Sequence, residues 1–352
     1  MSNPHLDYAG SFRLVRKVAA GGMATVYEAE QLGPHGFAKR IALKVIHPEY
    51  ARHPEWLQLF VDEAKLSANL LHGNVVQIYQ LGEVAGDYFI AMEFIRGVTL
   101  RKLIDRHREL DEPIPPALGA YVASRVCRAL DFAHNAVGPD GKRLDIVHRD
   151  VSPGNVMASW DGHIKLADFG IAKARTSADP AERRPMMMGK KHYMSPEQIL
   201  GLEVDARSDV FSLGVVLFEL LSLERLFREE VTQAAIDEVA VLPAPDLRAA
   251  LPGIAPGLER VLGSALAKDP FRRPTAAAMG RALDEWCTSQ QHVGTPDRLQ
   301  EHLARVFPET YQSPTAAADA SPSEPKTTFS NLRHAARATR RRRGVLGRLF
   351  GG

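Results

Sequence analysis

The sequence predicts an α+β protein in which a small β-rich lobe precedes a larger α-helical lobe. Residues 12–46 contain three runs of alternating apolar and polar side chains, as in strands, with glycines at the turns between them. Residues 55–71 place apolar side chains at three- and four-residue steps, which predicts a helix, and two more strand-like runs follow at 75–82 and 88–95. Helical periodicity dominates from there to Trp286. A sheet with one helix, followed by mostly helices, is the order expected of such a two-lobed chain.

The predicted helical lobe contains four strongly periodic segments. Residues 121–137 and 208–223 have the length and apolar content of buried helices, and 258–268 and 276–286 repeat the pattern more briefly. A chain of 352 residues that is 45% hydrophobic can bury a core of this size and form more than one lobe.

The composition also excludes several classes of protein. The two cysteines, Cys127 and Cys287, lie far apart and predict neither a disulfide framework nor a metal cluster. The longest apolar stretch, 213–221, is interrupted by Glu219 and is too short to span a bilayer. The first ten residues are polar and do not resemble a signal peptide. We therefore expect a cytoplasmic protein without a transmembrane segment.

The C-terminal part divides into three segments. Residues 288–311 predict a short helical extension, in which Thr295 caps a helix with Pro at its first position. Residues 312–332 are rich in Ser, Thr, Pro and Ala, which is typical of a disordered linker. Residues 333–352 hold seven Arg and no acid, so the +2 charge of the chain minus +7 for this tail leaves −5 for the rest.

Two interpretations of the basic tail stay open. It can bind an anionic membrane surface, nucleic acid or an acidic protein partner, which would place the protein peripherally at the membrane in the first case. It can equally be a solvated, disordered end.

The first candidate chemistry lies in the β-rich lobe. The stretch VAAGGMATVYEA at 18–29 has a glycine turn, in which backbone N–H groups can approach triphosphate oxygens, although a simple Gly-Gly hairpin turn is at least as common. Lys44 in the next strand can reach phosphates, and Glu63 in the predicted helix can hold it in place. Taken alone, both charges would be ordinary surface residues.

Two later motifs are more specific. In HRDVSPGN, Asp150 can orient an attacking hydroxyl and accept its proton, and Asn155 can supply an oxygen to Mg²⁺. In DFG, Asp168 offers a second carboxylate for metal that bridges phosphates. Each triplet also occurs in ordinary turns, but their succession after Lys44 and Glu63 is the signature set of protein kinases.

Across residues 12–287 the chain resembles a bacterial serine/threonine protein kinase of the eukaryotic-like (Hanks) type. GGMATVY, ALKVI, HGNVVQIYQLG, HRDVSPGN, KLADFGIAKA, YMSPEQ, SDVFSLGVVLFEL and KDPFRRPTA occur in family order. The resemblance implies the two-lobed protein kinase fold, with an N-lobe at about 12–95, a C-lobe at about 96–287 and ATP between them.

The resemblance also implies the nucleotide contacts. Met92 takes the gatekeeper position, and Glu93 and Ile95 offer hinge backbone to adenine. Val26, Ala42 and Met157 enclose the adenine ring in the family. With the glycine loop and the strand lysine, the implied ATP-binding residues are Val18, Ala19, Ala20, Gly21, Gly22, Met23, Ala24, Thr25, Val26, Ala42, Lys44, Glu93, Ile95 and Met157.

Two structural roles in the helical lobe follow from the same resemblance. Glu197 is expected to pair with Arg273, and Asp209 to hold the backbone of the catalytic loop. The alternative for all three is ordinary surface charge.

The glycine loop departs from the family pattern. The three positions of G-x-G-x-x-G are Ala19, Gly21 and Ala24. Alanine restricts the backbone but keeps the N–H donor, so we expect ATP binding that is weaker or stiffer, not absent.

The catalytic loop departs as well. Ser152 occupies the position where serine/threonine kinases of the family have Lys, and Lys190 occupies the position of their usual Thr. We expect the Lys190 ammonium to replace the missing charge near Asp150 and the γ-phosphate. The alternative is that Lys190, like Lys191, is a solvated loop residue.

Arg149 implies a basic pocket for a phosphorylated activation loop. Before the Lys pair, that loop has hydroxyls only at Thr176 and Ser177, so autophosphorylation is expected there if it occurs.

The function predicted from these residues is ATP- and Mg²⁺-dependent phosphorylation of serine or threonine in protein substrates. A pseudokinase scaffold that binds partners without phosphoryl transfer is the alternative. The missing glycines and Ser152 favour the scaffold, whereas retention of all five catalytic positions argues more strongly for the enzyme.

Overall fold

The computed structural model describes residues 12–84, 86–138, 140–169, 191–227, 239–242, 246–290 and 294–311. These residues form two compact units. The first contains residues 12–65 and 78–94, and the second contains 66–77 and 95–311 within the described ranges.

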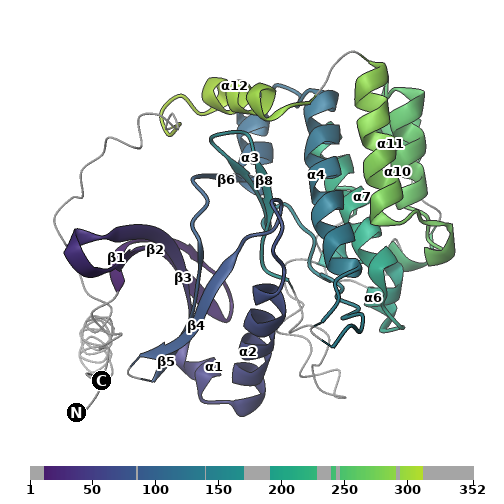
Figure 1. Ribbon diagram of the computed structural model, residues 1–352. Coiled ribbons are helices and arrows are strands. Elements are labelled where there is room, and N and C mark those ends of the chain that lie inside the picture. Colours follow the sequence, from purple (N-terminus) through teal and green to yellow (C-terminus); the bar gives the residue numbers. More distant parts are fainter. Residues whose placement is uncertain are drawn as a thin grey trace, which may run out of the picture. The chain divides into compact units, whose positions relative to one another are not determined.

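The first unit is an antiparallel sheet with two helices (Figure 1). Its strand order is β1-β2-β3-β5-β4. The strands are β1 (Phe12–Ala20), β2 (Ala24–Leu32), β3 (Ala38–Ile46), β4 (Ile78–Val84) and β5 (Asp87–Glu93), and the helices are α1 (Pro48–Ala51) and α2 (Pro54–Ala68).

The two faces of this sheet bury different side chains. One face carries a cluster that includes Phe12, Ile41, Leu43 and Phe89. On the other face, Ala24, Ile46 and Ile90 of the sheet pack against Phe60 and Ala64 of α2. The strands predicted from the period-2 pattern therefore form a sheet, and part of this sheet is buried on both faces.

The second unit is mostly helical. Its helices are α3 (Leu100–Leu110), α4 (Pro116–His134), α6 (Pro196–Leu200), α7 (Ala206–Ser222), α9 (Leu247–Ala250), α10 (Pro256–Ala265), α11 (Ala276–Ser289) and α12 (Pro296–Val306). It also has a small sheet in the order β6-β7-β8, with β6 (Gly97–Thr99), β7 (Val156–Ser159) and β8 (Ile164–Leu166).

Helix α7 lies at the centre of this unit. From Ser208 to Leu220 every residue is buried, because α4, α10 and α11 pack around it. A helix that is apolar on all sides is stable only inside such a bundle. The predicted α+β class, with a β-rich part before a helical part, is confirmed.

One predicted strand begins later than expected. The run at 75–82 forms β4 only from Ile78, because Val75 and Val76 pair with the end of β8: Val76 N donates to Leu166 O at 2.9 Å. A local pattern cannot distinguish two strand partners that lie about ninety residues apart in the chain.

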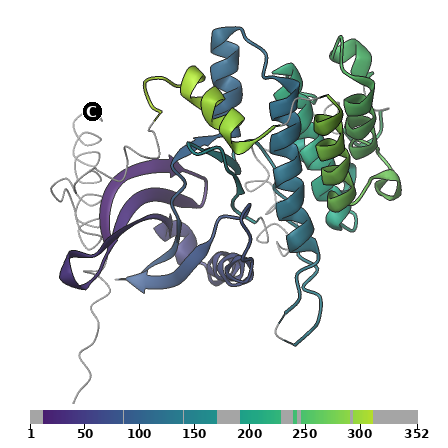
Figure 2. The same ribbon diagram turned by 45° about the horizontal axis from the view of Figure 1, so that its top comes forward.

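Helix α12 extends the second unit beyond the last predicted lobe helix and lies against α3 (Figure 2). Thr295 accepts a hydrogen bond from Arg298 N and Pro296 begins the helix. Its buried face presents Leu299, Leu303 and Val306, and Phe307 packs edge-on against Trp160. None of the helices in the described ranges is long and apolar enough to cross a membrane.

Candidate active site

In the first unit, Lys44 and Glu63 form an ion pair. Lys44 Nζ lies 2.6 Å from Glu63 Oε1, and the two side chains are 14% and 12% exposed. Strand β3 and helix α2 supply one residue each. A short, charge-assisted hydrogen bond of this kind holds the ammonium at a defined place.

The glycine loop is the turn between β1 and β2. Ala19 pairs with Val26 and Ala20 with Thr25, and Gly21 N closes the turn on Ala24 O at 2.9 Å. Residues 18–22 are exposed, as a ligand-binding turn requires.

The two alanines that replace glycines lie in strands, although the pairing of β1 with β2 shifts register between Lys17 and Ala19. Ala19 belongs to β1 and Ala24 to β2, and neither has a positive φ. The Ala24 methyl is buried in the cluster with Ile46 and Phe60. The loop therefore tolerates alanine there without backbone strain.

The implied adenine contacts divide between the units. In the first unit, adjacent strands carry Val26, Ala42, Met92 and Glu93, and Ala42 is paired directly with Met92. Ile95 and Met157 belong to the second unit, where Met157 lies in β7 opposite Thr99.

In the second unit, Asp150 and Asn155 lie together. Asn155 Nδ2 donates to Asp150 Oδ2 and to Asp150 O, both at 2.9 Å. Asn155 N also donates to Ser152 O at 3.0 Å, which closes the loop between the two residues. The proposed base and the proposed metal ligand are thus held by a short local network.

Asp209 anchors this loop from α7. Its Oδ2 accepts from His148 N and its Oδ1 from Arg149 N, each at 2.8 Å, and the carboxylate is fully buried. Arg149 has a φ of 61°, a left-handed conformation that these bonds stabilise. The role implied for Asp209 is confirmed.

His134 completes the anchor and was not singled out in the sequence. Its Nε2 lies 2.8 Å from Asp209 Oδ2, at the end of α4. Nothing in the residues around His134 predicts this partner, because Asp209 is 75 residues away.

Asp168 is connected to the catalytic loop through His148. His148 Nε2 donates to Ala167 O at 3.1 Å, so Nδ1 is the acceptor for Asp150 N at 3.2 Å. The ring also packs on Phe169, with 4.6 Å between centroids. Asp168 itself has a φ of 56°, so its backbone is in the left-handed region.

Ser152 is buried, and its Oγ has no hydrogen-bond partner among the described residues. Lys190, Thr176 and Ser177 lie outside the described residues.

Two buried charge clusters support the helical lobe. Glu197 receives two bonds from Arg273, at 2.6 and 2.9 Å, which confirms the implied pair. Glu219, which the sequence showed only as an interruption of an apolar run, is bonded by Arg101, Arg108 and the Tyr193 hydroxyl. Burial alone would raise the pKa of Glu219, but the bonds from Arg101 and Tyr193 outweigh it and lower the pKa.

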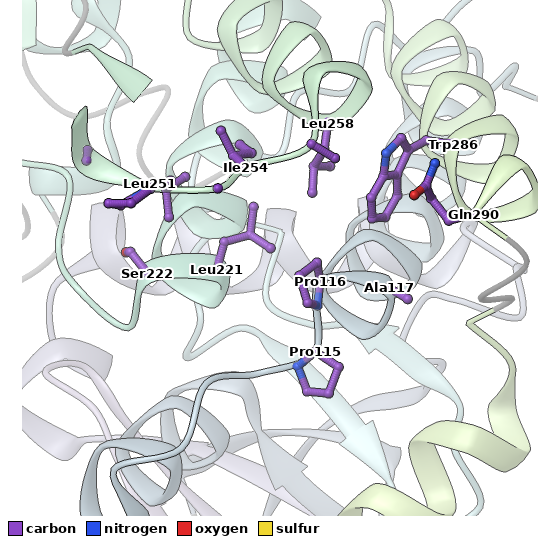
Figure 3. A pocket seen from close by; sticks show the side chains of 14 residues that line it. Pro115, Pro116, Ala117, Leu221, Ser222, Leu251, Ile254, Leu258, Trp286 and Gln290 are labelled. Carbon is purple, nitrogen blue, oxygen red and sulfur yellow. The ribbon is translucent and has the colours of Figure 1, made fainter. Parts of the chain in front are cut away.

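A cavity of about 540 Å³ opens elsewhere in the second unit (Figure 3). It lies between the first turn of α4, the end of α7, the connection before α10 and the end of α11. Leu221, Leu251, Leu258 and Trp286 give it an apolar wall. None of the predicted catalytic or nucleotide-binding residues lines it.

Comparison with known proteins agrees with this arrangement. The model of the protein kinase domain family matches residues 12–283. The tyrosine-protein kinase MasK of Myxococcus xanthus is 39% identical over 308 residues, which cover 86% of this chain and 45% of MasK. The serine/threonine-protein kinase PrkC of Bacillus subtilis is 33% identical over 265 residues, 75% of this chain and 38% of PrkC. The chain thus spans less than half the length of either relative.

A solved structure shares the fold. The kinase domain of Mycobacterium tuberculosis PknI superposes with a TM-score of 0.60 at 27% identity, covering 79% of this chain and 96% of that domain. The paired lysine and the anchored catalytic loop agree with the family match and with this likeness. The chain belongs to the protein kinase domain family.

Proposed function

We propose that this chain transfers the γ-phosphoryl group of ATP to serine or threonine hydroxyls of protein substrates, and to its own. The observation that carries the proposal is that the two units between them retain five side chains of the kinase signature. In the first unit Lys44 is paired with Glu63. In the second unit Asp150 is bonded to Asn155, and Asp168 follows Ala167, whose carbonyl is bonded by His148. A scaffold without activity would not require all five.

The residues fit ATP and Mg²⁺ by their donor types. Carboxylate and amide oxygens, as in Asp168 and Asn155, are the ligands that Mg²⁺ prefers. ATP supplies the transferred group, and the metal neutralises the charge that develops on it.

The chain's own residues then perform three tasks. Lys44, held by Glu63, neutralises the α- and β-phosphates. Asp150 accepts the proton of the attacking hydroxyl as the new P–O bond forms and the bond to ADP breaks. The buried Asp209 keeps the catalytic-loop backbone in place throughout.

Labelled ATP tests the proposal directly. We expect autophosphorylation, or phosphorylation of a generic protein substrate, by the wild type and its loss in Asp150→Ala. If the wild type binds nucleotide and transfers no phosphate under conditions that activate related kinases, the chain is a scaffold.

A tyrosine acceptor is the second candidate, and one comparison favours it. The relative that is 39% identical is named a tyrosine-protein kinase, and Ser152 replaces the Lys that serine/threonine kinases carry. Phosphoamino-acid analysis of the labelled product separates the two. Phosphoserine or phosphothreonine alone supports the first proposal, and phosphotyrosine supports the second.

Lys190 is proposed to supply the charge that Ser152 lacks. Its ammonium would act near Asp150 and the transferring phosphate. Lys190→Ala should then reduce turnover about as much as loss of Asp168, whereas the matched change Lys191→Ala should have little effect. Near-normal turnover of Lys190→Ala contradicts the proposal.

Control by the activation loop is proposed through Arg149. Burial lowers the pKa of the Arg149 guanidinium more than nearby Asp209 raises it. A phosphate that pairs with this half-buried cation would therefore stabilise its charge. Mass spectrometry should find phosphate on Thr176 or Ser177, and the Thr176→Ala/Ser177→Ala variant should be less active. Full activity of that variant excludes control at these sites.

The Arg-rich tail at 333–352 is proposed to bind an anionic membrane surface while the protein resides in the cytoplasm. Vesicles with acidic lipid should sediment the full chain more than a 1–332 truncation at low salt. Equal sedimentation of the two rules out a lipid role for the tail and leaves an acidic protein partner or a solvated end.

A further inference from the structure

His47, the residue that follows β3, forms three hydrogen bonds with the turn between β1 and β2. Its backbone N donates to Met23 O at 2.8 Å. Its ring is bonded at both nitrogens, with Nδ1 3.2 Å from Gly22 O and Nε2 2.9 Å from Thr25 Oγ1. The sequence analysis did not single out this residue.

The partners determine the tautomer of the neutral ring. A carbonyl oxygen can only accept, so Nδ1 carries the hydrogen that binds Gly22 O. In the neutral ring Nε2 is then an acceptor, and the hydroxyl of Thr25 donates to it. Thr25 is only 7% exposed, which shields this bond from water.

Packing reinforces the same contact. Met23 lies against the apolar cluster that contains Ala24, Ile46 and Phe60, and Tyr50 packs on that cluster from α1, which begins directly after His47. The loop tip is therefore tied to the corner between β3 and α1 by both polar and apolar contacts.

The bonds to His47 also orient the N–H groups of the loop. In a trans peptide the C=O and N–H of one plane point in opposite directions, and no cis peptide is present in the described residues. Since Gly22 O and Met23 O both point to His47, the N–H groups of Met23 and Ala24 point away from it. Backbone N–H groups of a turn of this kind are the donors with which a loop binds phosphate oxygens.

We propose that His47 is a positioning residue of the ATP-binding loop. By holding two carbonyls, it presets the phosphate-binding N–H groups in a loop that keeps only Gly21 of three expected glycines. This proposal rests on the proposed function, because it assumes that the loop binds the phosphates of ATP.

Two side-chain changes and a matched control test the role. His47→Ala removes both ring bonds, and Thr25→Val removes only the hydroxyl while keeping a β-branched strand residue. His53→Ala is the control, because His53 is an exposed histidine between α1 and α2. His47→Asn keeps a side-chain amide that can donate to Gly22 O.

The first readout is amide hydrogen exchange in the nucleotide-free protein. The peptide covering residues 20–26 should exchange faster in His47→Ala than in wild type or His53→Ala, with Thr25→Val between them. Exchange elsewhere in the first unit should not change.

The second readout is the dissociation constant of Mg·ADP together with the Michaelis constant for ATP. Both constants should rise about tenfold in His47→Ala, which loses two modest hydrogen bonds, and about threefold in Thr25→Val, which loses one. In His47→Ala the kcat at saturating ATP should stay near that of wild type, and His47→Asn should recover part of the affinity.

The outcomes separate the two proposals. Unchanged exchange, with Mg·ADP binding of His47→Ala and Thr25→Val within twofold of wild type, overturns the role of His47. Absence of nucleotide binding in the wild type overturns the proposed function, whatever the variants do. If His47→Ala does not fold, Thr25→Val decides the matter by the same measurements.

Discussion

The catalytic loop and the glycine loop are both held by a residue outside them, but the two anchors differ in kind. Asp209 is a fully buried carboxylate that accepts two backbone N–H groups of the catalytic loop. His47 is a half-buried imidazole that bonds the glycine loop through neutral groups. Charge-assisted bonds in a dry interior are strong and leave a large penalty when broken, whereas neutral bonds near solvent contribute modestly. We therefore expect the first anchor to decide whether its loop forms, and the proposed role of His47 implies that the second adjusts how well its loop binds.

Removal of the buried anchor should have the largest effect. Asp209→Ala leaves the N–H groups of His148 and Arg149 and the ring of His134 without their acceptor. We expect a loss of about 3–5 kcal/mol in the free energy of unfolding and no measurable kinase activity. Urea unfolding and the labelled-ATP assay measure the two effects.

Asp209→Asn is the matched control, since its amide retains one acceptor oxygen. It should lose less stability than Asp209→Ala. If both variants unfold at the urea midpoint of wild type, the Asp209 carboxylate does not anchor the catalytic loop.

Loss of the paired lysine should affect chemistry more than stability. Lys44 and Glu63 are largely buried, with side chains 14% and 12% exposed, and Lys44 is the proposed charge for the phosphates. Lys44→Met and Glu63→Gln should each reduce turnover by about 100-fold or more, and each should lower the urea midpoint less than Asp209→Ala does. A variant whose urea midpoint falls as far as that of Asp209→Ala would show that this pair also holds the fold together.

A smaller effect is expected at the contact between α3 and α12. His107 and His302 stack there with their Nε2 atoms 2.9 Å apart, and His107 Nδ1 bonds Glu112 O. Burial, with smaller contributions from the neighbouring His107 and Arg305, lowers the pKa of His302 to about 4, although Glu112 opposes the shift. Burial also lowers the pKa of His107.

The sign of the pH dependence follows from these directions. A histidine whose pKa is lower in the folded state stabilises the fold above its unfolded pKa of about 6.5, and this contribution is lost as the pH falls toward about 4. The urea midpoint should therefore drop between pH 7 and pH 4.5, and it should drop less in His302→Gln, whose amide does not titrate. Equal pH dependence in the two proteins would show that these histidines do not control the contact.

Much of the candidate site could be predicted because its groups are close in sequence. Asp150 and Asn155 are five residues apart, and their hydrogen bond follows from the conformation of one loop. The strand that carries Lys44 and the helix that carries Glu63 were recognisable from their periodicity, and the pairing of the two was expected from the family resemblance.

Other contacts were not predictable from local patterns. His134 meets Asp209, His302 meets His107, and Val76 joins β8 through separations of 75, 195 and about ninety residues. Glu219 looked like a defect in an apolar helix until Arg101, Arg108 and Tyr193 were found around it. Such partners are chosen by the packing of whole elements, which no single segment encodes.

The sequence by itself determined the order of elements and the family, and it predicted the residues that would handle phosphate and metal, because periodicity and contiguous motifs are local properties. Only the tertiary structure decided which residues hold those groups in position. His47 illustrates the reason: its ring has no motif of its own, and its role arises because the end of β3 lies beside the turn between β1 and β2. That proximity is a property of the folded sheet, in which residues twenty or more positions apart become neighbours.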